Sequence, residues 1–167
     1  PTHFSSINPW TEKYLRGFND YVTRLSYLLT EGEEVVSVAV LHPMRSAYLE
    51  YKREEERYGY RIGELENQFF NTYRMLSARG IGYHFLDETL LAKYGFVKEN
   101  TIGCGMCVYQ YLIIPPIFTM DSKTELLIRR YVENGGQVLV FGDGPSYLEG
   151  EPFYFSNLKS NCDFEKL

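Results

Sequence analysis

Residues 109–143 constrain the fold most strongly, because they read in succession as a strand, a helix and a second strand. An apolar run at residues 112–114 stops at two prolines, which cannot donate hydrogen bonds within a sheet. Apolar residues at i,i+4 spacing predict a helix that Asp121 or Ser122 caps, with Glu125 placed as in a capping box, and that Gly135-Gly136 ends. A second apolar run covers residues 138–141. Two buried strands joined by a helix predict a right-handed βαβ unit in a parallel sheet.

The same signals recur earlier in the chain. Near-continuous apolar runs predict strands at residues 35–41 and 83–86, and helical spacing predicts helices at residues 62–80 and 88–94. Residues 96–108 suit a small hairpin. The predicted fold is therefore α/β: a doubly wound, mostly parallel, flavodoxin-like sheet with strand order 2-1-3-4 and helices on both faces.

The rest of the chain divides into three predicted parts. Residues 1–33 read as a linker and a long connecting helix, with Pro9 at the first helical position and Gly32 at the end. Residues 34–150 form the α/β domain, and residues 151–167 form an irregular C-terminal extension rich in turn-forming and aromatic residues. Because such a domain does not need the long helix, we expect that helix to dock from a preceding domain or to cover a sheet edge.

Charge and hydropathy exclude two kinds of partner. The net charge is −5 and no basic stripe is present, so nucleic acid is not expected as a partner. No run of 18 apolar residues occurs, so no membrane span is expected. The chain opens at Pro1 rather than Met, as a piece excised from a longer protein does, and the compartment stays open between cytoplasmic and exported.

Ligands of doubly wound sheets bind beyond the carboxyl ends of the strands. That rule nominates His42, Arg45 and Ser46 after the first strand, Asp87 and Glu88 after the second, Pro115 and Pro116 after the third, and Asp143 after the fourth. Tyr48 and Tyr147 lie near these positions in the sequence and could stack on a ligand. The candidate crevice or interface residues are therefore His42, Arg45, Asp87, Asp143, Tyr48 and Tyr147.

The strand ends match no familiar catalytic or cofactor site. The segment after the first strand has Ser46 but no glycine, which argues against a phosphate or flavin loop. Two prolines replace the acid that a phospho-acceptor domain needs after the third strand. A glutaminase-type elbow needs Cys or Ser between its glycines, whereas here they flank Asp143. We therefore expect no catalytic residue of these kinds.

Cys104 and Cys107 form a CxxC pair, and Cys162 is the third cysteine. Redox pairs of this spacing lie at a helix N-terminus, whereas this pair leads into an apolar strand. A zinc site would need a second pair of ligands. Two free thiols in a hairpin are the favoured interpretation, and no cofactor or metal is expected.

Four segments together resemble a known family: VVSVAVLHPMRSAYLEY (residues 35–51), GIGYHFLDETLL (80–91), YQYLIIPP (109–116) and RRYVENGGQVLVFGDGPSYLEG (129–150). They are similar to the class I glutamine-amidotransferase-like domain inside multidomain bacterial glycoside hydrolases. Examples are the trimerisation-type domain of certain β-galactosidases and the matching region of α-L-rhamnosidase-like enzymes. The preceding residues 19–43 resemble the helix that connects this domain to an upstream catalytic barrel.

The resemblance implies a flavodoxin-like sheet without working glutaminase residues, used for assembly or for shaping a neighbouring active site. The catalytic carboxylates would lie on the barrel, so the sugar stays open. Neighbouring domains of the parent chain, further copies of the chain, or a carbohydrate are the partners that this interpretation allows.

Two hypotheses from other classes stay open. One is a small-molecule or carbohydrate binding module at the strand ends, and the other is an enzyme that uses Cys104 or Cys107.

Overall fold

The computed structural model describes residues 9–51, 60–155 and 158–167. The chain divides into unit 1, Pro1–Val35, and unit 2, Val36–Leu167. The linker predicted ahead of the first helix lies outside the described residues. No described helix is both long enough and apolar enough to cross a membrane.

Unit 1 contains helix α1 (Pro9–Thr30). Pro9 opens this helix, where the missing N–H of proline costs nothing. Large apolar side chains recur at three- and four-residue steps along α1, which places them on one side of the helix. Within this unit they are exposed: Tyr14, Phe18, Tyr21, Val22, Leu25, Leu28 and Leu29.

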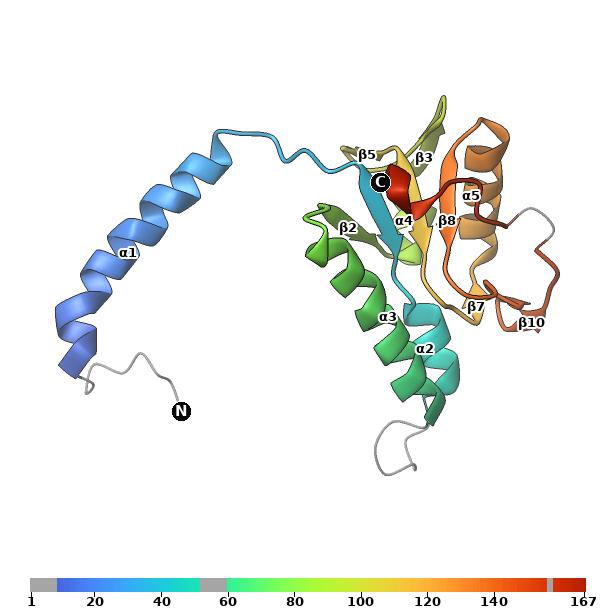
Figure 1. The fold of residues 1–167 in the computed structure, drawn as a ribbon, viewed down its shortest axis with the longest axis horizontal. Coiled ribbons are helices and arrows are strands. Elements are labelled where there is room, and N and C mark those ends of the chain that lie inside the picture. The colour runs from blue at the N-terminus through green and yellow to red at the C-terminus, as the bar shows by residue number, and fades with distance from the viewer. Residues whose placement is uncertain (1–8, 52–59, 156–157) are drawn as a thin grey trace. The chain divides into compact units, whose positions relative to one another are not determined.

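Unit 2 is built on a four-stranded parallel sheet (Figure 1). Its strands are β1 (Val38–Leu41), β2 (Tyr83–Leu86), β6 (Tyr111–Ile114) and β8 (Gln137–Val140), in the spatial order β2-β1-β6-β8. All three neighbouring pairs are parallel. The α/β class and the parallel sheet are confirmed, and the four strands stand in the order assigned from the sequence.

Helices cover both faces of the sheet. Because successive strand residues point to opposite faces, the strands contribute side chains to two separate hydrophobic clusters. On one face, Ala39, Leu112 and Val138 join a buried cluster with residues of α4 (Glu88–Tyr94) and α5 (Ser122–Glu133). On the other face, Val40 and Ile113 pack with Leu76 of α3 (Tyr60–Ala78). The short helix α2 (Met44–Glu50) follows β1 at the carboxyl edge of the sheet (Figure 1).

Two smaller sheets flank the main one. β3 (Gly95–Lys98), β4 (Thr101–Cys104) and β5 (Cys107–Tyr109) form an antiparallel sheet in sequence order. The second small sheet contains β7 (Thr119–Met120), β9 (Tyr147–Leu148) and β10 (Glu151–Pro152), in the spatial order β10-β9-β7. Residues 151–167 were expected to be irregular, and the two-residue strand β10 at their start differs from that expectation. A strand of two residues is too short to show the alternation that identifies strands in a sequence.

The C-terminal segment packs against the edge strand β8. The Val138 backbone N–H donates to the Asn161 side-chain oxygen at 2.7 Å, and the Asn161 N–H donates to the Val138 carbonyl at 3.0 Å. Cys162 is buried beside them, and the short 3-10 helix η1 (Phe164–Lys166) follows. This irregular segment therefore satisfies part of a sheet edge that would otherwise be open to pairing.

Candidate functional site

The candidate site lies at the carboxyl edge of the parallel sheet, where α2, α4 and the segment before α5 meet. Arg45 on α2 supplies a positive charge at this edge. Its Nε donates to Asp121 Oδ2 at 2.9 Å, and its Nη2 donates to Thr89 Oγ1 at 3.4 Å. The edge therefore gathers side chains that are up to 76 residues apart in the sequence.

Either Asp121 or Ser122 was expected to cap α5 with its side chain. Asp121 occupies the N-cap position, but its carboxylate makes no cap hydrogen bond. The carboxylate pairs with Arg45 instead. The correction has a physical reason, because a nearby guanidinium offers a stronger, charge-assisted hydrogen bond than a backbone N–H.

Ser46 is fully buried and holds backbone groups. Its hydroxyl oxygen accepts from the N–H groups of Phe118, at 2.8 Å, and Thr119, at 3.1 Å. The hydroxyl can also donate to the Thr119 carbonyl at 3.4 Å. Ser46 thus joins α2 to the segment that leads into β7, and its oxygen is occupied by structural bonds rather than presented as a nucleophile.

Asp87 and Glu88 follow β2 and have different structural roles. Asp87 caps α4, its Oδ1 accepting from Thr89 N at 2.8 Å and Leu90 N at 3.3 Å. Glu88 is only 3% exposed, and its Oε2 accepts from the backbone N–H of Asp121 at 2.7 Å. The carboxylate of Glu88 therefore ties the start of α4 to the start of α5.

Burial raises the pKa of Glu88 to about 7. The charge of Asp121 raises this pKa further, whereas the Asp121 N–H, the Thr124 hydroxyl and the charge of Arg45 lower it. Thr124 Oγ1 is the one buried side-chain oxygen or nitrogen, within the part of the chain that the structure describes, that lacks a hydrogen-bond partner of regular geometry. Because burial outweighs the groups that favour the anion, the neutral acid suits its surroundings better than the anion below pH 7.

His42 lies beside aromatic rings rather than beside a nucleophile. Its ring meets the Phe69 ring edge to face at 5.3 Å between centroids and lies 5.8 Å from the Phe85 ring. Burial lowers the pKa of His42, and the charge of Asp87 partly offsets that effect. A neutral, half-buried imidazole packed on two phenyl rings suits packing better than general base catalysis.

The six residues nominated from the sequence do not form one crevice. Arg45 and Tyr48 line a hollow of about 300 Å³ with Asp121 and Glu149. Asp143 and Tyr147 line a separate hollow of about 270 Å³. His42 and Asp87 line neither of these two hollows.

Glu149 completes the first hollow from the turn between β9 and β10. Its carboxylate accepts hydrogen bonds from the hydroxyl and the N–H of Ser122, which lower the pKa of Glu149. The hollow therefore combines the Arg45 guanidinium, two carboxylates and the exposed Tyr48 ring. These groups could hydrogen-bond a polar ligand and stack on it, but they include neither a thiol nor a histidine.

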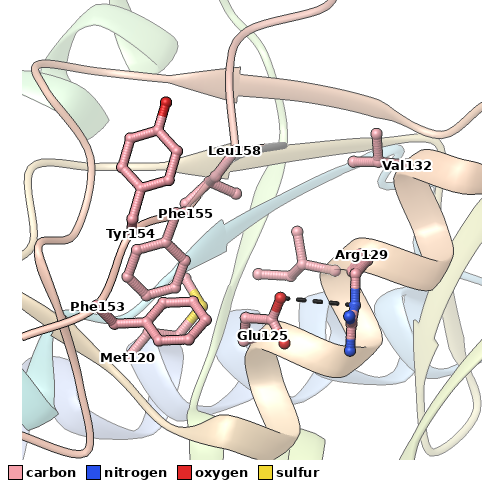
Figure 2. Close-up of a pocket in the computed structure, with 9 residues that line it drawn as sticks. Met120, Glu125, Arg129, Val132, Phe153, Tyr154, Phe155 and Leu158 are labelled. Carbon is pink, nitrogen blue, oxygen red and sulfur yellow. Dashed lines mark ion pairs between the residues drawn. The ribbon is translucent and has the colours of Figure 1, made fainter. Parts of the chain in front are cut away.

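A further pocket lies between α5 and the segment after β10 (Figure 2). It measures about 120 Å³, and Phe153, Phe155 and Met120 supply apolar walls. Glu125 and Arg129 on α5 pair with each other at 3.6 Å, as the dashed line in Figure 2 marks. The pocket offers space for a small apolar group but no reactive side chain. No local sequence pattern indicates this pocket, since its walls come from separate segments of the chain.

The CxxC pair lies in a hairpin, as the sequence predicted. Cys104 ends β4 and Cys107 begins β5, and both are free thiols. Burial, together with the charge of Cys107, raises the pKa of the Cys104 thiol. This environment is the opposite of that of an activated redox cysteine.

No group of three or more histidine, cysteine, aspartate or glutamate side chains among the described residues is arranged to hold a metal ion. No family model matches the chain, and neither the curated proteins nor the solved structures contain a match.

Proposed function

We propose that the chain is a non-catalytic, class I glutamine-amidotransferase-like domain with a flavodoxin-like sheet, and that it belongs to a larger bacterial glycoside hydrolase. Its role there is to support assembly or to shape a neighbouring active site through protein contacts. The observation that carries this proposal is the long apolar side of α1, which no other described residue of unit 1 covers. The strand order β2-β1-β6-β8 and the sequence resemblance support the fold assignment.

An amphipathic helix of this kind normally buries its apolar side in a protein core. Fully burying one large apolar side chain contributes about 1.5–3 kcal/mol, so leaving seven of them in water would be costly. A contiguous apolar surface of that size usually marks a contact with another protein surface. A neighbouring domain of the parent enzyme is the partner that the resemblance suggests.

The sheet edge supports a non-catalytic role. The polar side chains buried there hold the chain together: Ser46 joins α2 to β7, and Glu88 joins α4 to α5. Asp143 occupies the position where a glutaminase needs a thiol, and it lies in a different hollow from Arg45. An edge whose buried polar groups serve packing suits a scaffold better than an enzyme.

The test uses the whole gene product. The variant Phe18→Ser with Leu25→Ser removes one aromatic and one aliphatic side chain from the apolar side of α1. The matched control, Asn19→Ser with Thr23→Ser, alters the polar side of the same helix. We expect the first pair to lower glycosidase activity or oligomeric state, with the control unchanged. Equal behaviour of the two double variants would refute the contact.

The chain alone should turn over neither glutamine nor aryl-glycosides. Measurable turnover of either by the purified chain, retained after a second purification step, would overturn the non-catalytic assignment.

A second candidate function rests on the hollow beside α2. Its Arg45, Asp121, Glu149 and Tyr48 could bind a sugar or another hydroxylated small molecule through hydrogen bonds and ring stacking. Calorimetry with mono- and disaccharides tests it: binding that Tyr48→Ala abolishes supports this function, and no heat of binding at millimolar sugar removes it.

A further inference from the structure

The tip of the β4–β5 hairpin holds two sulfur atoms on one face of a sheet. Cys104 and Cys107 are direct cross-strand partners, and paired residues of an antiparallel ladder point to the same face. Only Gly105 and Met106 separate them, and Gly105 has the positive φ of 63° that the tight turn needs. Both thiols are free.

The surrounding strands fix this arrangement. β4 is paired on both sides, with β3 and with β5, and the Gly105 N–H donates to the Tyr94 carbonyl at 3.1 Å. On the opposite face of β4, the Phe96 ring lies so close over Gly103 that a Cβ there would come within 2.3 Å of it. The two sulfurs therefore project from a rigid element rather than from a flexible loop, which suits a preorganised site.

The two cysteines differ in solvent exposure. Cys104 is half-buried and packs against the main hydrophobic cluster, whereas Cys107 is exposed and Met106 is fully exposed. A ligand can therefore reach the pair from the side of Cys107.

The spacing suits an ion between the sulfurs better than a direct S–S bond. Residues that flank a two-residue turn form a hydrogen-bonded pair, with Cα atoms about 5.5 Å apart and Cβ atoms near the wide end of about 4.5–5.5 Å. A disulfide needs Cβ atoms about 3.5–4.5 Å apart. Two metal–sulfur bonds on opposite sides of one ion separate the sulfurs by roughly 4–5 Å.

We propose that Cys104 and Cys107 form a two-thiolate binding site for a soft monovalent metal ion, copper(I). Soft thiolate ligands favour copper(I), zinc and iron–sulfur clusters, and copper(I) is the one for which two thiolates in a linear geometry suffice. Zinc requires four ligands, and the described residues add no further cysteine, histidine or carboxylate to this pair. On binding, two S–H bonds break, two Cu–S bonds form and two protons leave to solvent, so a cation and two neutral thiols become a complex of charge −1.

The experiment is an anaerobic competition between the reduced full chain and the copper(I) chelator bicinchoninate, with copper(I) supplied as its acetonitrile complex. We expect the unaltered chain to withhold one equivalent of copper(I) from the chelator. Cys104→Ser and Cys107→Ser should each withhold none. Cys162→Ser, which alters the buried cysteine beside β8, is the matched control and should behave like the unaltered chain.

Three results would overturn the proposal. The unaltered chain could withhold no copper(I), Cys107→Ser could still withhold a full equivalent, or Cys162→Ser could lose binding while remaining folded by circular dichroism. Because Cys107 is exposed, its serine variant cannot fail through lost core packing, and its result is decisive.

Discussion

Replacing Glu88 with glutamine should make the protein more stable at neutral and alkaline pH. Glutamine has the shape of the protonated acid, so its side-chain oxygen can still accept from the Asp121 N–H, and its amide can donate to Thr124 Oγ1. The change removes only the ionisation of a carboxyl that is 3% exposed. The groups that act on this carboxyl are Asp121, Thr124 and Arg45.

The direction and size of the expected stability change follow from the pKa of Glu88. The pKa of Glu88 is about 7 in the folded chain against 4.5 for an ordinary glutamate, so folding favours the protonated form. Below pH 4.5 both states are protonated, and the full stabilisation is present. Between pH 4.5 and pH 7 the unfolded state ionises first, so stability falls as pH rises, by about 3 kcal/mol in total; above pH 7 this loss is complete.

Urea unfolding of unit 2, followed by circular dichroism at pH values from 4.5 to 8, measures this difference. Glu88→Gln should match the unaltered chain near pH 4.5 and exceed its free energy of unfolding by about 2–3 kcal/mol at pH 8. Glu133→Gln, at an exposed position on α5, is the control and should change stability by less than about 0.5 kcal/mol at each pH. A Glu88→Gln variant that is less stable at pH 8, or whose difference does not grow with pH, would refute this reasoning.

Three further changes test the packing by the same urea assay. Ser46→Ala leaves two backbone N–H groups without their acceptor and should cost about 2–3 kcal/mol; a loss below about 0.5 kcal/mol would contradict that role. Gly136→Ala places a Cβ 2.2 Å from the Tyr131 ring and should cost about 1–3 kcal/mol, so an unchanged midpoint would be inconsistent with the close approach. Gly63→Ala lies within α3 with no atom within 4 Å of the new Cβ, and should stabilise by up to about 1 kcal/mol; destabilisation would argue against that helix.

The main sheet could be predicted because its strands carry strong local signals. The strand at Tyr83–Leu86 and the helix at Glu88–Tyr94 have the bounds expected from the sequence. The first strand is shorter than expected, because Val35 to Ser37 are apolar or small but make no ladder, and the structure begins it at Val38. Apolar runs mark buried strands, but their ends depend on which neighbours pair with them.

The candidate site could be predicted only in part. The rule for strand ends nominated Arg45 and Asp143 together, with Tyr48 and Tyr147 as nearby rings. In the structure, Asp143 and Tyr147 line a different hollow from Arg45 and Tyr48. Asp121, the partner of Arg45, precedes a helix by one residue, and from sequence alone it was one of two candidates for the helix cap. Which acid a given cation meets depends on tertiary packing, which no local pattern encodes.

The raised pKa of Glu88 also could not be predicted from the sequence. Its position after β2 nominates it as a site residue, but its burial depends on α5, which lies more than thirty residues later in the chain. A carboxylate next to a helix-capping aspartate has no sequence signal for a raised pKa, since that shift arises from loss of water around the folded group.

The most direct test of a scaffold role is hydrogen exchange of α1 in the whole gene product and in the isolated chain. If the apolar side of α1 contacts a neighbouring domain, the backbone N–H groups of α1 that exchange readily in the isolated chain will be protected in the whole protein, and Phe18→Ser with Leu25→Ser will remove that protection. Equal exchange of these amides in both proteins would contradict the proposal that this helix acts through a protein contact.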